Sequence, residues 1–313
     1  MPRSENVSTH GIPCEQVLAD FHVYLAETKG MRDGTQRIYV RHVREFLNSE
    51  FPLGKMLGEE LNGRVICRYI TEHASRGQIV ATKLATTALR SFVRYLMVRG
   101  ECDAFLINSV PAVCNRKLSR VPTVLSSAQV QAILASFDRS TPLGLRNYAI
   151  VLCLARLGLR AGDVVGLTLD DVDWRSGTLR VRGEKSRRPS IMPMPHEVGS
   201  AIAAYIQEGR PTTSERRIFV SHARGPEKGK SITSSAIWPV VHRTARNCGI
   251  DTIRVGAHTL RHTFASHMLQ NGVELKQIAD VLGHRSLNAT FLYTKVDLRH
   301  LSEVAQPWPV VKS

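Results

Sequence analysis

The sequence lacks the features that identify several common protein classes. Its six cysteines include no C-x-x-C pair and suggest neither a zinc site nor a disulfide framework, which favours a reducing compartment. No N-terminal stretch resembles a signal peptide, and no apolar run approaches membrane-spanning length. Internal repeats, heptad arrays and low-complexity tracts are also missing. These absences predict a folded cytoplasmic protein.

Acidic residues are comparatively scarce. The 313 residues contain 27 acidic and 42 basic side chains, which gives a net charge of +15, and the basic excess is present in both the first 120 residues and the remainder. Such a charge predicts a polyanionic partner that touches both parts, with nucleic acid the leading candidate and an anionic membrane surface the second. The hydrophobic fraction of 43% is that of a globular protein, and the length allows two domains with separate cores.

Apolar residues in the first third recur at helical spacing. Four stretches show this period, at residues 15–29, 35–47, 65–70 and 84–96, and predict a small helical domain over residues 1–105. Basic residues form stripes on two of these helices. The stripes are either solvated faces or phosphate contacts, and the excess of arginine over lysine favours DNA. The predicted contacts are Arg37, Arg41, Arg44, Lys83, Arg90 and Arg94.

A basic, proline-containing segment follows. Residues 106–122 have no sustained period and predict a linker whose Arg116 and Lys117 lie along a DNA backbone. Ser126 and Gln129 then have the spacing of a capping box, and residues 148–157 are apolar enough for a buried helix.

The period changes again at residues 169–194. A strand over residues 178–182, a charged turn and a strand returning toward Met194 predict a small antiparallel sheet. Helical patterns resume at residues 198–207, at 234–247 and from His258 onward, with breaks at Asn271-Gly272 and at Gly283. The predicted fold is mainly α with a small antiparallel β-sheet in the C-terminal domain, residues 123–313.

Four separated stretches of this domain carry residues suited to phosphate chemistry. LGLRAGDVVGL contains Arg160, RGEKSRR contains Lys185, HTLRHTFASHML contains His258 and Arg261, and LGHRSLNATFLYT contains His284 and Tyr293. His258 and Arg261 are three residues apart and share one helix face. None of these motifs is decisive alone, and a core position for Tyr293 is the simpler interpretation of its stretch taken singly.

Together, in this order and context, the stretches resemble the tyrosine recombinase (phage integrase) family, in the manner of its Xer-type members. The resemblance covers about residues 123–313, and the N-terminal part resembles the family's core-binding, DNA-binding domain by pattern only. It implies a catalytic set of Arg160, Lys185, His258, Arg261, His284 and Tyr293. Asp163 is expected to orient Arg160 or His258, where the family often has Glu. Arg187 and Arg188 follow Lys185 in the same turn, so the role assigned to Lys185 can belong to a neighbouring residue of that turn. Both arginines are expected to contact DNA.

The chemistry suits these residue types. Two guanidiniums offer forked donors to the oxygens of a phosphodiester, and a phenol is both a nucleophile and a leaving group. His258 is expected to accept the tyrosine proton, Lys185 to protonate the departing 5′ oxygen, and His284 to donate a hydrogen bond to the phosphate. No carboxylates cluster at metal spacing, so the expected reaction needs no metal. The covalent intermediate keeps the bond energy, so no ATP is expected either.

The resemblance implies a site-specific DNA recombinase that acts in the cytoplasm, on the nucleoid, for DNA integration or another recombination outcome. Its expected substrate is double-stranded DNA with inverted-repeat core sites, bound by a homo-tetramer, and the chain end suggests a mobile element. Residues 296–304 have helical spacing and predict a tail helix that docks on a neighbouring subunit or folds back on its own domain. Two functional alternatives stay open: strand relaxation like that of a type IB topoisomerase, and a catalytically silent DNA-binding regulator.

Overall fold

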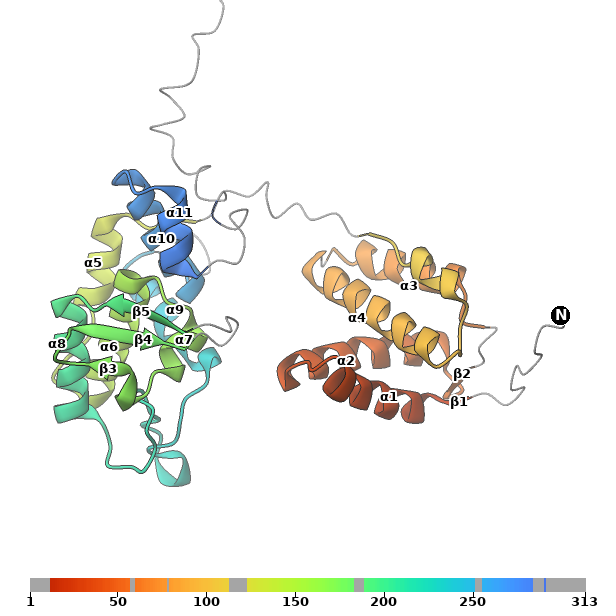
Figure 1. Cartoon of the computed structure of the whole chain (residues 1–313), viewed down its shortest axis with the longest axis horizontal. Coiled ribbons are helices and arrows are strands. Elements are labelled where there is room, and N and C mark those ends of the chain that lie inside the picture. Colours follow the sequence, from red (N-terminus) through yellow and green to blue (C-terminus); the bar gives the residue numbers. More distant parts are fainter. Residues whose placement is uncertain are drawn as a thin grey trace, which may run out of the picture. The chain divides into compact units, whose positions relative to one another are not determined.

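The computed structural model describes two compact units of the chain. They comprise Met1–Arg116 and Lys117–Ser313, and each is treated separately below (Figure 1). The described residues are 12–56, 60–77, 79–112, 123–182, 189–250, 255–283 and 290. Within them no helix is long and apolar enough to cross a bilayer.

The described part of the first unit is mostly helical. Its core consists of aromatic and aliphatic side chains from the long helices, with Phe21, Phe46 and Phe92 almost fully buried. The sequence pattern predicted these helices, although it did not predict the short antiparallel pair in which Ile12 lies opposite Met56. The elements are β1 (Ile12–Pro13), α1 (Cys14–Val23), the π-helical turn η1 (Tyr24–Thr28), α2 (Asp33–Glu50), β2 (Lys55–Met56), α3 (Gly63–Ser75), α4 (Ile79–Val98) and the 3-10 helix η2 (Ala104–Ser109).

The first unit extends further along the chain than the sequence suggested. Leu106 and Val110, placed in the linker by their sequence context, are buried in the core of this unit. The Arg90 guanidinium donates to the carbonyl oxygens of Val110 and Pro111, at 2.9 and 3.2 Å. Because periodicity alone does not detect a short 3-10 helix, the predicted linker begins several residues too early.

The second unit is built around α6 (Pro142–Leu157). This helix begins at Thr141, whose hydroxyl accepts from the Gly144 N–H, has Pro142 in its first turn, and ends at Gly158 with φ +59°. Its residues 149–154 are at most 1% exposed, as expected for a helix covered on all sides. The other helical elements are α5 (Ser127–Ala135), α7 (Ala161–Gly166), η4 (Leu169–Asp171), α8 (His196–Ala204), η5 (Tyr205–Gly209), η6 (Gly225–Glu227), η7 (Ser234–Ala236), α9 (Ile237–Asn247), α10 (Ala257–Gln270) and α11 (Leu275–Leu282).

A three-stranded antiparallel sheet joins these helices, in the order β3 (Val172–Asp173), β4 (Thr178–Val181) and β5 (Ser190–Pro193). Val181 lies opposite Ser190, so the connection that contains Lys185 links the ends of β4 and β5. The predicted hairpin is thus confirmed. Strand β3 was not predicted, because two residues are too short to show alternation.

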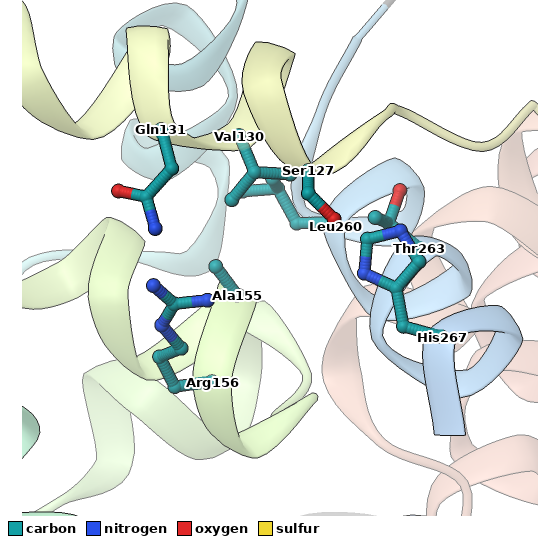
Figure 2. Close-up of a pocket in the computed structure, with 8 residues that line it drawn as sticks. All are labelled: Ser127, Val130, Gln131, Ala155, Arg156, Leu260, Thr263 and His267. Atoms are coloured by element: carbon teal, nitrogen blue, oxygen red, sulfur yellow. The ribbon is translucent and has the colours of Figure 1, made fainter. Parts of the chain in front are cut away.

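Helix α10 has one face that packs on the unit and another that carries the predicted site. Leu260, Thr263 and His267 line a cavity of about 40 Å³ with residues of α5 and α6, where Gln131 and Arg156 extend into the space between those helices (Figure 2). The Thr263 hydroxyl accepts from the Leu125 N–H at 2.9 Å and anchors α10 to the chain before α5. The capping box predicted at Ser126 is confirmed, since its hydroxyl accepts from Gln129 N–H and the Gln129 side chain accepts from Ser126 N–H. This face holds α10 in place and leaves the opposite face for His258 and Arg261.

Candidate active site

Arg160 stands at the start of α7, directly after the chain leaves α6. Its Nη2 donates to the Gly283 carbonyl at 3.3 Å, and its Nη1 lies 3.8 Å from a carboxylate oxygen of Asp163. The same Asp163 oxygen accepts from the Arg160 backbone N–H at 3.4 Å. Asp163 is buried, whereas 29% of the Arg160 side chain is exposed. The carboxylate therefore orients a guanidinium that remains open to solvent.

Arg261 lies on α10 and is only 4% exposed. Its Nη1 donates to the Gly158 carbonyl and its Nη2 to the Leu282 carbonyl, both at 2.6 Å. These short bonds connect the end of α6 to the end of α11. Helix C-termini carry carbonyls without intrahelical partners, and they favour a cation in this position.

The two arginines meet at one place on the main chain. Their Nη2 atoms donate to consecutive carbonyls, those of Leu282 and Gly283, although Arg160 and Arg261 are far apart in the sequence. Two cations held together repel each other, and the Asp163 carboxylate lies 3.8 Å from the Arg160 guanidinium. An anion that binds both guanidiniums relieves this repulsion.

Two glycines make this approach possible. Gly158 and Gly283 end α6 and α11 with φ of +59° and +60°, a conformation that other residues adopt at a cost. A Cβ at Gly158 would also lie 2.4 Å from a ring carbon of Phe264. The break predicted at Gly283 is confirmed as a helix end.

His258 is exposed in the first turn of α10, and its ring stacks on His262 with centroids 5.9 Å apart. Burial, followed by the positive charges of His258 and Arg261, lowers the pKa of His262 to about 4. His262 is therefore neutral at pH 7. The only sequence signal for this contact is the spacing of four residues between His258 and His262.

The remaining predicted catalytic residues lie outside the described residues. These are Lys185, His284 and Tyr293, together with the predicted DNA contacts Arg116, Lys117, Arg187 and Arg188. The sequence nevertheless shows which described elements Lys185 and His284 adjoin. Lys185 belongs to the connection between β4 and β5, and His284 directly follows Gly283.

The predicted DNA contacts of the first unit differ in their environments. Arg37 and Arg94 are exposed and Lys83 is half-buried. Arg41 pairs with Glu45 at 3.8 Å and Arg44 with Glu15 at 3.6 Å, on exposed side chains where ion pairs are weak. Arg90 differs from all of these, because its guanidinium binds the carbonyls at the end of the unit.

The sequence interpretation overlooked the surface of α9. Trp238 and His242 stack with ring centroids 4.6 Å apart, and they line a shallow hollow with Arg243 and Arg246. Trp238 is 47% exposed, and it also lies against Gly256, two residues before His258. The helical spacing of an aromatic ring and two arginines was the available signal.

The chain is similar in sequence to known integrases and recombinases. The family model described as the phage integrase family matches residues 123–300. A relative named as an integrase/recombinase, y4rA of Sinorhizobium fredii, is 39% identical over 295 residues, which cover 94% of this chain and 71% of that protein. Tyrosine recombinase XerD of Listeria monocytogenes is 29% identical over 300 residues, 92% of this chain and 96% of that protein.

Solved structures show the same fold. The XerH site-specific recombinase bound to palindromic difH substrate, in a post-cleavage complex, matches with a TM-score of 0.70 at 17% identity and covers 96% of this chain and 98% of its own. A lambda integrase dimer bound to a COC′ core site matches with a TM-score of 0.66 at 18% identity, over 88% and 96% of the two chains. The chain belongs to the phage integrase family and is a tyrosine recombinase.

Proposed function

We propose that this recombinase cuts and rejoins DNA at specific sites through a covalent bond between Tyr293 and a 3′ phosphate. The observation that carries the proposal is the convergence of Arg160 and Arg261 on consecutive carbonyls at the end of α11. That pair provides a cationic site for one phosphodiester, and the first turn of α10 adds the exposed His258. The segment that contains Tyr293 follows directly after Gly283 in the sequence.

In the proposed reaction the Tyr293 hydroxyl oxygen attacks the phosphorus atom, and the bond between phosphorus and the 5′ oxygen breaks. His258 accepts the phenol proton, and Lys185 supplies a proton to the 5′ oxygen. Arg160, Arg261 and His284 stabilise the charge that develops on the nonbridging oxygens. The free 5′ hydroxyl of a second strand then attacks the phosphotyrosine, releases Tyr293 and conserves the bond energy, so that no ATP is needed.

Both units contribute to DNA binding in this proposal. The first unit offers Arg37, Arg41, Arg44, Lys83 and Arg94, whose exposed or half-buried positions leave them accessible to phosphates. In the second unit we add the α9 surface, where Arg243 and Arg246 stand beside the stacked Trp238 and His242. We assign Arg90 a bracing role instead.

Assembly is the second part of the proposal. The lambda integrase is described as a tetramer bound to a Holliday junction, and its structure matches this chain with a TM-score of 0.67 at 17% identity. We propose that four copies of this chain assemble on paired inverted-repeat core sites. In this proposal residues 296–304, whose apolar residues have helical spacing, bind the neighbouring subunit. The setting is the cytoplasm, with DNA of the nucleoid or of a mobile element as the substrate.

The decisive experiment removes the hydroxyl oxygen of Tyr293. DNA that spans both ends of the coding region is incubated with the wild-type protein, with Tyr293→Phe and with the control Tyr148→Phe, and covalent protein–DNA adducts are separated on denaturing gels. We expect adducts with the wild type and the control and none with Tyr293→Phe, while DNA binding is retained by all three. An adduct formed by Tyr293→Phe would refute the assignment.

The adduct assay together with the topology of the DNA products distinguishes the alternatives. A silent regulator gives no adduct with any of the three proteins. A topoisomerase-like enzyme gives the adduct but only relaxes supercoiled circles, whereas a recombinase also exchanges the flanking DNA partners.

A further inference from the structure

Three side chains that can bind a metal lie together in the first unit and do not belong to the proposed active site. One ring nitrogen of His42, one ring nitrogen of His73 and one carboxylate oxygen of Glu45 all lie within 4.8 Å of one another. His42 and Glu45 are three residues apart on α2, so they share one helix face. His73 comes from α3. The sequence did not reveal this cluster because His73 is distant in the chain from the other two.

His42 is the central residue of the cluster. It is only 3% exposed, and its Nδ1 lies 3.2 Å from a Glu45 carboxylate oxygen. In the described part of the chain its Nε2 is buried and has no hydrogen-bond partner. A buried polar atom without a partner is destabilising, which makes this nitrogen an exception that calls for a ligand.

The chemistry of the ligands suits a cation. An imidazole ring binds a metal through the lone pair on one nitrogen. His42 offers such a nitrogen, because its buried Nε2 has no hydrogen-bond partner in the described part of the chain. Glu45 contributes the negative charge that a divalent metal requires.

His73 is also oriented by a neighbour. Its Nδ1 lies 3.1 Å from the Thr82 hydroxyl, which leaves Nε2 as its ligand atom, and its ring centroid is 6.4 Å from that of His42. A hydrogen bond to one imidazole nitrogen is the usual support for a metal bound to the other. The exposed Glu45 side chain pairs with Arg41 only at 3.8 Å, so it can rotate toward a metal at little cost.

We propose that His42, Glu45 and His73 form a binding site for a divalent transition metal, with Zn²⁺ the best fit, which fastens α2 to α3. Two imidazoles and a carboxylate match the ligand preference of Zn²⁺, and water completes a tetrahedron. Zinc–ligand bonds of about 2.0–2.1 Å place ligands roughly 3.3 Å apart, so the side chains close by up to about 1.5 Å on binding. The metal takes no part in strand cleavage, because none of its ligands belongs to the catalytic set.

Zinc binding to the full chain tests this site. Tag-free protein is stripped with chelator, dialysed against Zn²⁺ alone and analysed for bound metal. The proteins compared are the wild type, Glu45→Gln and His73→Gln, with Glu72→Gln and His22→Gln as matched controls, because Glu72 and His22 are exposed residues of the same unit. Far-UV circular dichroism of the metal-free proteins checks that each variant folds.

The expected result is one more Zn²⁺ per chain in the wild type and in both controls than in Glu45→Gln and His73→Gln. Zinc at a hundred times its dissociation constant should also raise the melting temperature of the first unit by about 10 °C in the proteins that keep the site. Mg²⁺, which avoids imidazole, should have no such effect. Equal zinc content in all five proteins, or an equal thermal shift, would overturn the proposal.

Discussion

Arg261 and Arg160 have the same proposed role, but the structure predicts different consequences when each is replaced by lysine. Both changes keep a positive charge and remove the planar fork that binds two oxygens at once. Arg261 is buried and bridges the ends of α6 and α11 with two bonds of 2.6 Å. Arg160 is partly exposed and makes one bond of 3.3 Å beside Asp163.

The magnitudes follow from these contacts. A hydrogen bond from a charged group contributes about 1.5–3 kcal/mol, and a lysine at position 261 can retain at most part of one of the two. Arg261→Lys should therefore lower the free energy of unfolding by about 2–4 kcal/mol. Arg160→Lys should lower it by less than about 1 kcal/mol, because its contacts are longer and partly screened by solvent.

Urea denaturation of the two variants and the wild type measures this difference, and the adduct assay measures catalysis on the same samples. Both variants should form the covalent adduct at least about a hundred-fold more slowly, since each loses a bidentate contact to the phosphate. Equal stability of the two variants would refute the structural role of the buried arginine. A normal adduct rate in either one would refute its phosphate contact.

Three further predictions concern the general acid, the tail and the half-buried His262. Lys185→Ala should lower the rate of cleavage much more than the affinity for DNA. A substrate with a bridging 5′ phosphorothiolate should restore cleavage, because its leaving group needs no proton. Rescue of Arg187→Ala alone would assign the general acid to Arg187. Deletion of residues 297–313 should preserve half-site binding in a gel shift but abolish strand exchange, whereas normal exchange by the truncated protein would contradict the docking role of the tail. His262 has a pKa near 4 when folded against an ordinary value of 6.5, so the unfolded state takes up its proton first as the pH falls, and this destabilisation develops between about pH 6.5 and 4. Relative to His262→Asn, the wild type should lose about 2–3 kcal/mol of stability over that range in urea titrations, and parallel pH profiles would contradict this.

Much of the fold could be predicted because local signals agreed with packing. The helical spacing around Phe46 and the apolar run after Tyr148 predicted the helices that are observed as α2 and α6. Each helix buries the residues that are apolar in its sequence. The Ser126 capping box and the glycine break at residue 283 were readable for the same reason, because side chain and backbone chemistry act there within four residues.

Features that depend on distant residues were not predictable. Nothing in the sequence near Arg261 indicates that its guanidinium binds the Gly158 and Leu282 carbonyls, because main-chain acceptors look alike in every sequence. The burial of Val110 and the proximity of His42 and His73 likewise arise only from tertiary packing. The catalytic residues were predicted from order and context and stay predictions, whereas the contacts that hold Arg160 and Arg261 could not be predicted from the sequence.

The shared attachment of both guanidiniums at Leu282 and Gly283 makes two parts of the reaction thermodynamically reciprocal. A phosphate that draws Arg160 or Arg261 toward itself changes the free energy of the bonds that hold the end of α11. By linkage, any contact that changes these bonds at Leu282 and Gly283 must change phosphate affinity in the proposed reaction by the same factor. The proposed phosphate site is therefore coupled to the end of α11 within one protomer, without any separate signalling element.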